Sequence, residues 1–161
     1  MPSNTAAYLT GAEEPLKLRE APYTEPGPNE IVVRNHAVAI NPVDCATQLL
    51  GTNLFPWLEF PAITGYDVAG EVVAIGSDVT RFQVGDRVIG LTTKAFQTFV
   101  PVLAHVASHI PPSISYEQTA VLPLGLATAS VGLFSKDCLG LEYPSVDVKP
   151  TGKSLLIWCC L

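Results

Sequence analysis

The sequence predicts a mainly β fold, a barrel or sandwich of short strands that is followed by a helical segment. Three observations support this prediction. Short stretches rich in β-branched residues recur at close spacing through the first two thirds of the 161 residues. The 14 prolines suit short strands that end in sharp corners. From residue 113 onward, the apolar and small residues follow a pattern typical of helices instead.

Four strands are predicted before that change. The first, EIVVRNHAVAI at residues 30–40, follows the turn cluster EPGPNE, and Asn41-Pro42 ends it because proline has no N–H for the ladder. Gly70 in the next strand indicates a bulge or the close approach of another backbone. The remaining predicted strands are DVAGEVVAIG at 67–76, GDRVIGL at 85–91 and KAFQTFVPV at 94–102.

Residues 113–134 are predicted to be helical. Ser115 and Gln118 have the spacing of a capping box, in which side chains satisfy the first free N–H groups of a helix. Pro123 divides the segment into a short helix and a longer one. The final stretch, KSLLIWCCL at 153–161, begins like a buried parallel strand. We therefore expect a barrel over residues 1–112 and a second segment over 113–161.

Composition excludes several classes of protein. With 48% hydrophobic and 15% charged residues, the chain is globular rather than disordered. A formal net charge of -6 disfavours nucleic acid as a partner. No apolar run reaches the roughly 20 residues of a membrane span, and the N-terminus does not resemble a signal peptide. The four cysteines lack a C-x-x-C spacing, which disfavours a zinc knuckle or a disulfide framework, so we expect a reduced, cytoplasmic protein.

Three isolated signals for chemistry are weak. TGKS at residues 151–154 lacks the earlier glycine of a phosphate-binding loop and precedes an apolar stretch, not a helix. His105 and His109 would share a face only on a helix, and their surroundings predict strand and loop. Cys45 has no basic partner nearby in the sequence that would activate it as a nucleophile.

An ordered set of motifs resembles the medium-chain dehydrogenase/reductase superfamily. The motifs are AINPVD, GYDVAGEVVAIGSDVTRFQVGDRV, FQTFV, IPPSISYEQTAVLPLGLATA and GKSLLIW. Within it, the chain is most similar to the zinc-independent quinone-oxidoreductase and enoyl-reductase branch, including fungal trans-acting enoyl reductases. The resemblance implies a GroES-like barrel, then the first strand of a Rossmann domain. Its Gly65, Gly70, Gly76 and Gly85 are expected at turns and at crowded positions.

The resemblance also implies that no zinc is bound. In the zinc-dependent branch, a cysteine, a histidine and a glutamate stand where this chain has Asn41, Tyr66 and Asp67. A catalytic zinc needs about three nitrogen, sulfur or carboxylate donors in one cluster, and Asp67 alone does not supply them. The cysteine-rich structural zinc lobe of that branch is absent as well.

The corner NPVDCA is the part that the resemblance places against the nicotinamide end of NADP(H). The predicted cofactor-binding residues are Asn41, Val43, Asp44, Cys45, Ala46 and, from the helical segment, Thr128. Relatives often carry a lysine at the position of Ala46, so a positive group is missing here. From the residues alone, the corner is also explained as a proline-terminated turn that Asp44 caps, which is compatible with a binding role. A threonine amid small residues, such as Thr128, is also ordinary helix packing.

These observations lead to two hypotheses. The first is the substrate-side domain of an NADP(H)-dependent enoyl or quinone reductase that acts on a small molecule. The chain stops where the glycine-rich turn for the pyrophosphate is expected, so on its own it should bind NADP(H) poorly and be inactive. The rival is a non-catalytic barrel that binds a protein partner or regulates a full-length homologue, with a co-chaperonin as a weaker third option. The C-terminal apolar strand would then be a site of self-association or partner binding.

Overall fold

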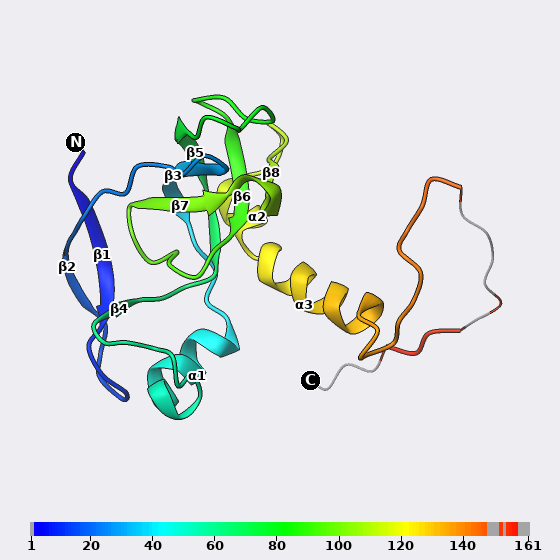
Figure 1. The fold of residues 1–161 in the computed structure, drawn as a ribbon, viewed down its shortest axis with the longest axis horizontal. Helices are drawn as coiled ribbons and strands as arrows, with labels where there is room; N and C mark the ends of the chain where they lie inside the picture. Colours follow the sequence, from blue (N-terminus) through cyan, green and yellow to red (C-terminus); the bar gives the residue numbers. More distant parts are fainter. Residues whose placement is uncertain (1, 148–151, 153, 158–161) are drawn as a thin grey trace. The chain divides into compact units, whose positions relative to one another are not determined.

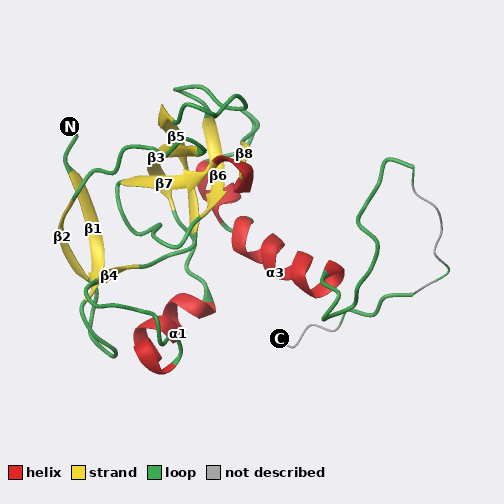
Figure 2. Ribbon diagram, in the orientation of Figure 1, coloured by secondary structure: helices red, strands yellow, loops and turns green. Residues whose placement is uncertain are grey.

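The structure is a computed structural model that describes residues 2–147, 152 and 154–157, and it confirms the mainly β fold (Figure 1). The chain forms two compact units, residues 1–127 and 128–161. Every strand of the described residues lies in the first unit, as do the helices before residue 121; Figure 2 colours the strands yellow and the helices red. The predicted domain boundary between residues 112 and 113 stays a prediction. Within the described residues, no helix has both the length and the apolar character to cross a lipid bilayer.

A five-stranded antiparallel sheet forms the body of the first unit. Its strands, in spatial order, are β7 (Phe99–Leu103), β3 (Glu30–Ala37), β5 (Asp67–Ile75), β6 (Arg87–Leu91) and β8 (Ala107–His109). Strands β3, β5 and β6 fall within the predicted strands and β7 overlaps the fourth, because apolar, β-branched side chains here face a shared core. Strand β8 was not predicted. That core contains Ile31, Val33, Val68, Val72, Val88, Val100 and Val102.

The bulge and the close backbone approach that Gly70 indicates in the sequence are both present in the structure. The register between β3 and β5 shifts between Asn35 and Ala37, opposite this part of β5. A Cβ on Gly70 would lie 2.1 Å from the backbone oxygen of Arg34. Only glycine therefore lets the two strands approach this closely.

A three-stranded sheet completes the barrel. Its strands, in spatial order, are β2 (Lys17–Ala21), β1 (Asn4–Leu9) and β4 (Ala62–Ile63). It is joined to the large sheet by a bridge between Ala6 and Gln97, and the Asn4 side chain donates to the Gln97 side chain over 2.9 Å. None of these strands was predicted, because β2 is short and charged and β1 is rich in alanine rather than β-branched residues.

The helices confirm the local signals after residue 112. Helix α2 (Tyr116–Ala120) begins with the predicted capping box: the Ser115 hydroxyl accepts from Gln118 N over 3.2 Å, and the Gln118 side chain accepts from Ser115 N over 3.0 Å. Helix α3 (Pro123–Phe134) begins at the predicted proline. Short 3₁₀ turns cover Gly51–Asn53 and Ala104–Val106.

Two predictions of local structure need correction. The corner after Pro42 is a nine-residue helix, α1 (Pro42–Leu50), rather than a turn alone; proline at the first helical position has no N–H to leave unsatisfied. The predicted C-terminal strand is absent over residues 154–157, and its other residues lie outside those that the structure describes. A parallel strand forms only by pairing with neighbouring strands, so an apolar sequence does not create one by itself.

Candidate functional site

The buried carboxylate of Asp67, the first residue of β5, is the centre of a rigid corner. Its side chain is fully buried. One oxygen accepts a hydrogen bond from the Asn41 side-chain amide, and the other accepts from the backbone N–H of Leu124, both over 2.7 Å. Hydrogen bonds to an ionised group are short and strong. Asp67 thereby fastens the start of α1 and the first turn of α3 to the large sheet.

Asp44 lies in the same corner. One of its oxygens accepts from the backbone N–H of Asn41 over 2.7 Å, which satisfies a free donor at the start of α1. The other oxygen is buried and has no hydrogen-bond partner among the described residues. Burial raises the pKa of the Asp44 carboxyl, the Asn41 N–H opposes this rise, and the nearby charge of Asp67 adds to it. The corner therefore has negative potential and carries one unmatched acceptor.

The other predicted cofactor-binding residues have different surroundings. Val43 and Ala46 are half-buried on α1, and Cys45 is exposed on the same helix. Thr128 lies in the second compact unit, so its predicted proximity to the corner stays a prediction. The structure thus places Asn41 and Asp44 together in one hydrogen-bonded corner, with Asp67 as a third member.

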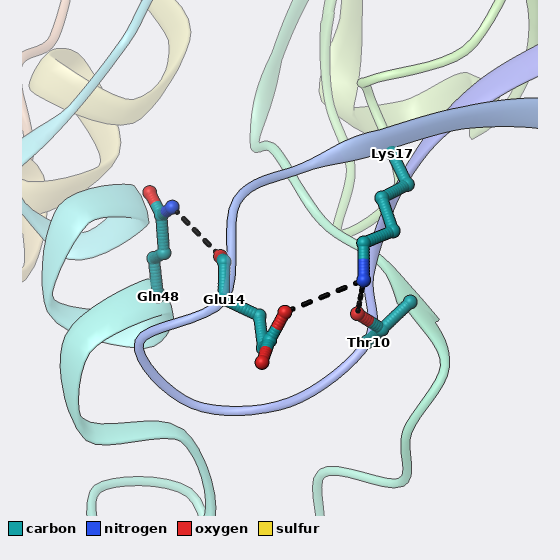
Figure 3. A network of polar contacts seen from close by, with 4 residues as sticks. All are labelled: Thr10, Glu14, Lys17 and Gln48. Carbon is teal, nitrogen blue, oxygen red and sulfur yellow. Dashed lines mark hydrogen bonds and ion pairs between the residues drawn. The ribbon is translucent and has the colours of Figure 1, made fainter.

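The far end of α1 is held by the turn between β1 and β2, as Figure 3 shows. The Gln48 side chain donates to the backbone oxygen of Glu14 over 2.9 Å. The Glu14 carboxylate pairs with Lys17 over 3.3 Å, and Lys17 also donates to the Thr10 hydroxyl over 3.4 Å. The ion pair is exposed and adds little stability. Together with Asp44 at its start, these contacts fix the position of α1 along its length.

A cleft of about 840 Å³ lies beside α1. Its lining comes from β1, α1, the segment that follows α1, β4, the segment before β5, and the loop after β6. The lining residues are Tyr8, Thr47, Phe55, Trp57, Leu58, Glu59, Phe60, Pro61, Ala62, Ile63, Thr64, Tyr66, Thr93 and Lys94. Apolar and aromatic walls with a few polar groups are typical of small-molecule sites.

This cleft was not predicted from the sequence, and none of the six predicted cofactor-binding residues lines it. The one available signal was the stretch NLFPWLEFP at residues 53–61, an aromatic-rich segment outside any predicted strand. Trp57 in this stretch is 77% exposed, and its ring centroid lies 5.4 Å from that of Phe55. Exposed aromatic side chains that gather at a hollow favour a binding role over a packing role.

Tyr66 connects the cleft with the corner. It lines the cleft and directly precedes Asp67 in the chain. Burial raises the pKa of its phenol, and the negative charge of Asp44 raises it further. Tyr66 is therefore a neutral hydrogen-bond donor at ordinary pH.

The arrangement does not fit a zinc ion. Asn41 and Asp67, at the positions of two zinc ligands in the zinc-dependent branch, hydrogen-bond to one another instead. In the described part of the chain, no group of three or more His, Cys, Asp or Glu side chains is placed to hold a metal. His105 lies in a 3₁₀ turn and His109 in β8, where His109 contacts Asp86 over 3.1 Å. The prediction that these histidines do not share a helix face is confirmed.

The sequence and the fold both match known proteins. Residues 27–109 match the alcohol dehydrogenase GroES-like domain. The chain is 51% identical to the dehydrogenase orf1 of Aspergillus niger, covering 98% of this chain and 48% of that protein. It is 38% identical to the enoyl reductase component lovC of lovastatin nonaketide synthase from Aspergillus terreus, over 93% of this chain and 42% of that protein. The chain thus spans about half the length of the curated relatives it matches.

Solved structures agree with these relatives. An alcohol dehydrogenase superfamily protein from Novosphingobium aromaticivorans superposes with a TM-score of 0.75 at 33% identity, over 83% of this chain and 42% of that one. Escherichia coli quinone oxidoreductase, solved as a complex with NADPH, superposes with a TM-score of 0.69 at 29% identity, over 85% of this chain and 41% of that one. The chain therefore belongs to the alcohol dehydrogenase GroES-like domain family of the medium-chain dehydrogenase/reductase oxidoreductases.

Proposed function

We propose that this chain is the substrate-side domain of an NADP(H)-dependent reductase that transfers hydride to an activated carbon–carbon double bond. The observation that carries the proposal is the 840 Å³ aromatic cleft beside the Asn41–Asp67 corner. The corner is the segment that the family resemblance places at the nicotinamide. Relatives named as an enoyl reductase component and a quinone oxidoreductase support an activated alkene or quinone as the substrate.

The residues of the corner fit the uncharged dihydronicotinamide end of NADPH. Val43, Cys45 and Ala46 present small side chains on α1, and the carboxylates of Asp44 and Asp67 would repel phosphates. The cofactor supplies the hydride, and the protein binds and orients the reacting groups. Thr128 stays a member of the proposed set by family resemblance alone.

Because the hydride must come from the cofactor, weak cofactor binding predicts that the chain alone is inactive. In full-length relatives the pyrophosphate is held by a glycine-rich turn and a helix N-terminus in the Rossmann half. Phosphate groups need directed donors, and Lys94 is the one cationic residue among those that line the cleft. Binding of NADPH to the chain alone should be weak, without measurable turnover of an enone.

The proposal includes a zinc-independent reaction. Its support is the direct hydrogen bond between Asn41 and Asp67, which uses the side chains that a metal would need. The electrophilic group for the substrate must then come from the protein.

Ligand binding to the chain tests this proposal. Trp57 lines the cleft, and replacing the second tryptophan, Trp158→Phe, leaves Trp57 as the single tryptophan, which excitation above the tyrosine absorption reports selectively. We expect 3-methylcyclohex-2-enone, an enone whose β-substituent slows addition of thiols, to change Trp57 fluorescence saturably. NADPH should produce little change and no turnover. Absence of any saturable response to enones and quinones would contradict the substrate-side assignment, and rapid NADPH-dependent turnover would contradict the inactivity of the isolated chain.

A further inference from the structure

The backbone around Tyr66 is fixed on both sides. The Tyr66 carbonyl oxygen accepts from the backbone N–H of Thr92 over 2.8 Å. Gly65 before it adopts a φ of 94° and packs under the Phe96 ring, so that a Cβ at Gly65 would lie 2.5 Å from that ring. Asp67 after it is held by two hydrogen bonds. The fold therefore sets the backbone position from which the Tyr66 side chain reaches the cleft lining.

The hydroxyl of Tyr66 is available to a ligand. It forms no hydrogen bond with any residue that the structure describes, whereas the nearby Thr47 hydroxyl donates to the Val43 carbonyl over 2.6 Å. Burial and the charge of Asp44 raise its pKa, which keeps the phenol protonated. A phenol with a raised pKa is a weak acid but a fully competent hydrogen-bond donor.

We propose that the Tyr66 hydroxyl donates a hydrogen bond to the carbonyl oxygen of an α,β-unsaturated carbonyl substrate bound in the cleft. This inference rests on the proposed function and deepens it by naming the electrophilic group. Tyr66 stands at a position where the zinc-dependent branch has a metal ligand, so the phenol would supply the polarisation that a metal supplies there.

The chemistry of an enone explains why a donor is needed at this place. When hydride adds to the β carbon, the electron pair of the C=C bond moves toward the carbonyl, and its oxygen becomes an enolate oxygen. A preorganised donor interacts more strongly with this developing negative charge than with the neutral carbonyl. Tyr66 keeps its proton throughout, and water supplies the proton that completes the reduction at the α carbon.

A pair of matched ligands tests the hydrogen bond. The ketone 3-methylcyclohex-2-enone and the hydrocarbon 1-methylcyclohexene have nearly the same shape, but only the ketone has a carbonyl oxygen. In the Tyr66→Phe variant, we expect affinity for the ketone to fall about three- to tenfold, the range for one neutral hydrogen bond. Affinity for the hydrocarbon should not change. The carbonyl ¹³C resonance of the bound ketone should move downfield in the wild type and lose this shift in the variant.

Two further measurements test the role of Tyr66: substitution of Lys94, the other possible donor, and a pH titration. Lys94 also lines the cleft and is the rival donor, and Lys94→Met should lower the affinity for the ketone less than Tyr66→Phe does. In the unsubstituted chain, affinity for the ketone should fall as the pH rises through the raised pKa of Tyr66, while that for the hydrocarbon stays constant. This pH titration does not require the Tyr66→Phe variant to fold.

The outcomes separate the two proposals. If neither ligand binds the unsubstituted chain, the proposed function fails. If both bind and the ketone affinity is unchanged by Tyr66→Phe, or is lost with Lys94→Met instead, the role of Tyr66 is overturned while the proposed function stands.

Discussion

Replacing Asp67 by alanine should destabilise the barrel far more than replacing another acidic residue of the same strand. The fully buried carboxylate accepts two hydrogen bonds of 2.7 Å, from the Asn41 side chain and from Leu124 N. The Asp67→Ala variant leaves both donors without a partner and removes the crosslink between α1, β5 and α3. Hydrogen bonds to charged groups contribute about 1.5–3 kcal/mol each. We therefore expect the free energy of unfolding to fall by about 3–5 kcal/mol.

Glu71 provides the matched control, because it is also an acidic residue of β5. Its carboxylate pairs with Arg34 over 2.9 Å, and these side chains are 33% and 48% exposed. An exposed ion pair contributes at most about 1 kcal/mol, so Glu71→Ala should have a small effect.

Urea unfolding, followed by circular dichroism, measures the difference. With a slope of about 2 kcal/mol per molar urea, the midpoint should fall by about 2 M for Asp67→Ala and by about 0.5 M or less for Glu71→Ala. Hydrogen exchange at the Leu124 amide should accelerate in the first variant alone. Equal midpoints for the two variants, or an unchanged Leu124 amide, would show that Asp67 does not hold the corner together.

Three further predictions concern other parts of the first unit. Hydrogen bonds from the backbone of its own turn and from His109 lower the pKa of Asp86. The contribution of this carboxylate to stability is therefore complete above the ordinary aspartate pKa of about 3.9 and is lost as the pH falls through the lowered value. The stability difference between wild type and Asp86→Asn should vanish in acid. Gly70→Ala should prevent folding, because its Cβ would overlap the Arg34 carbonyl, whereas Gly125→Ala, with no atom within 4 Å, should raise stability by up to about 1 kcal/mol in thermal melts. Elemental analysis of protein purified without a metal-affinity tag should find no zinc, and one tightly held zinc per chain would refute the zinc-independent proposal.

Several elements could be predicted because their signals are local. The central strands β3, β5 and β6 consist largely of apolar, β-branched residues whose preference for a buried sheet does not depend on the partner. The start of α2 follows from two side chains three residues apart, and the start of α3 follows from one proline. The motifs also sufficed to identify the family, since their order is a property of the sequence alone.

The candidate site depended on the tertiary structure. The family resemblance marked Asp67 as a position where the zinc-dependent branch has a glutamate. Its hydrogen-bond partner Leu124, however, lies 57 residues further along the chain. The cleft brings Tyr8 together with Trp57, Tyr66 and Lys94, and none of these residues predicts the others. Strand β2 is charged, with Leu18 78% exposed, so only its pairing with β1 makes it a strand. The physical reason is the same in each case: a hydrogen bond, a strand pair or a cleft wall that joins distant segments is decided by the folded backbone, and neither segment alone carries a pattern for it.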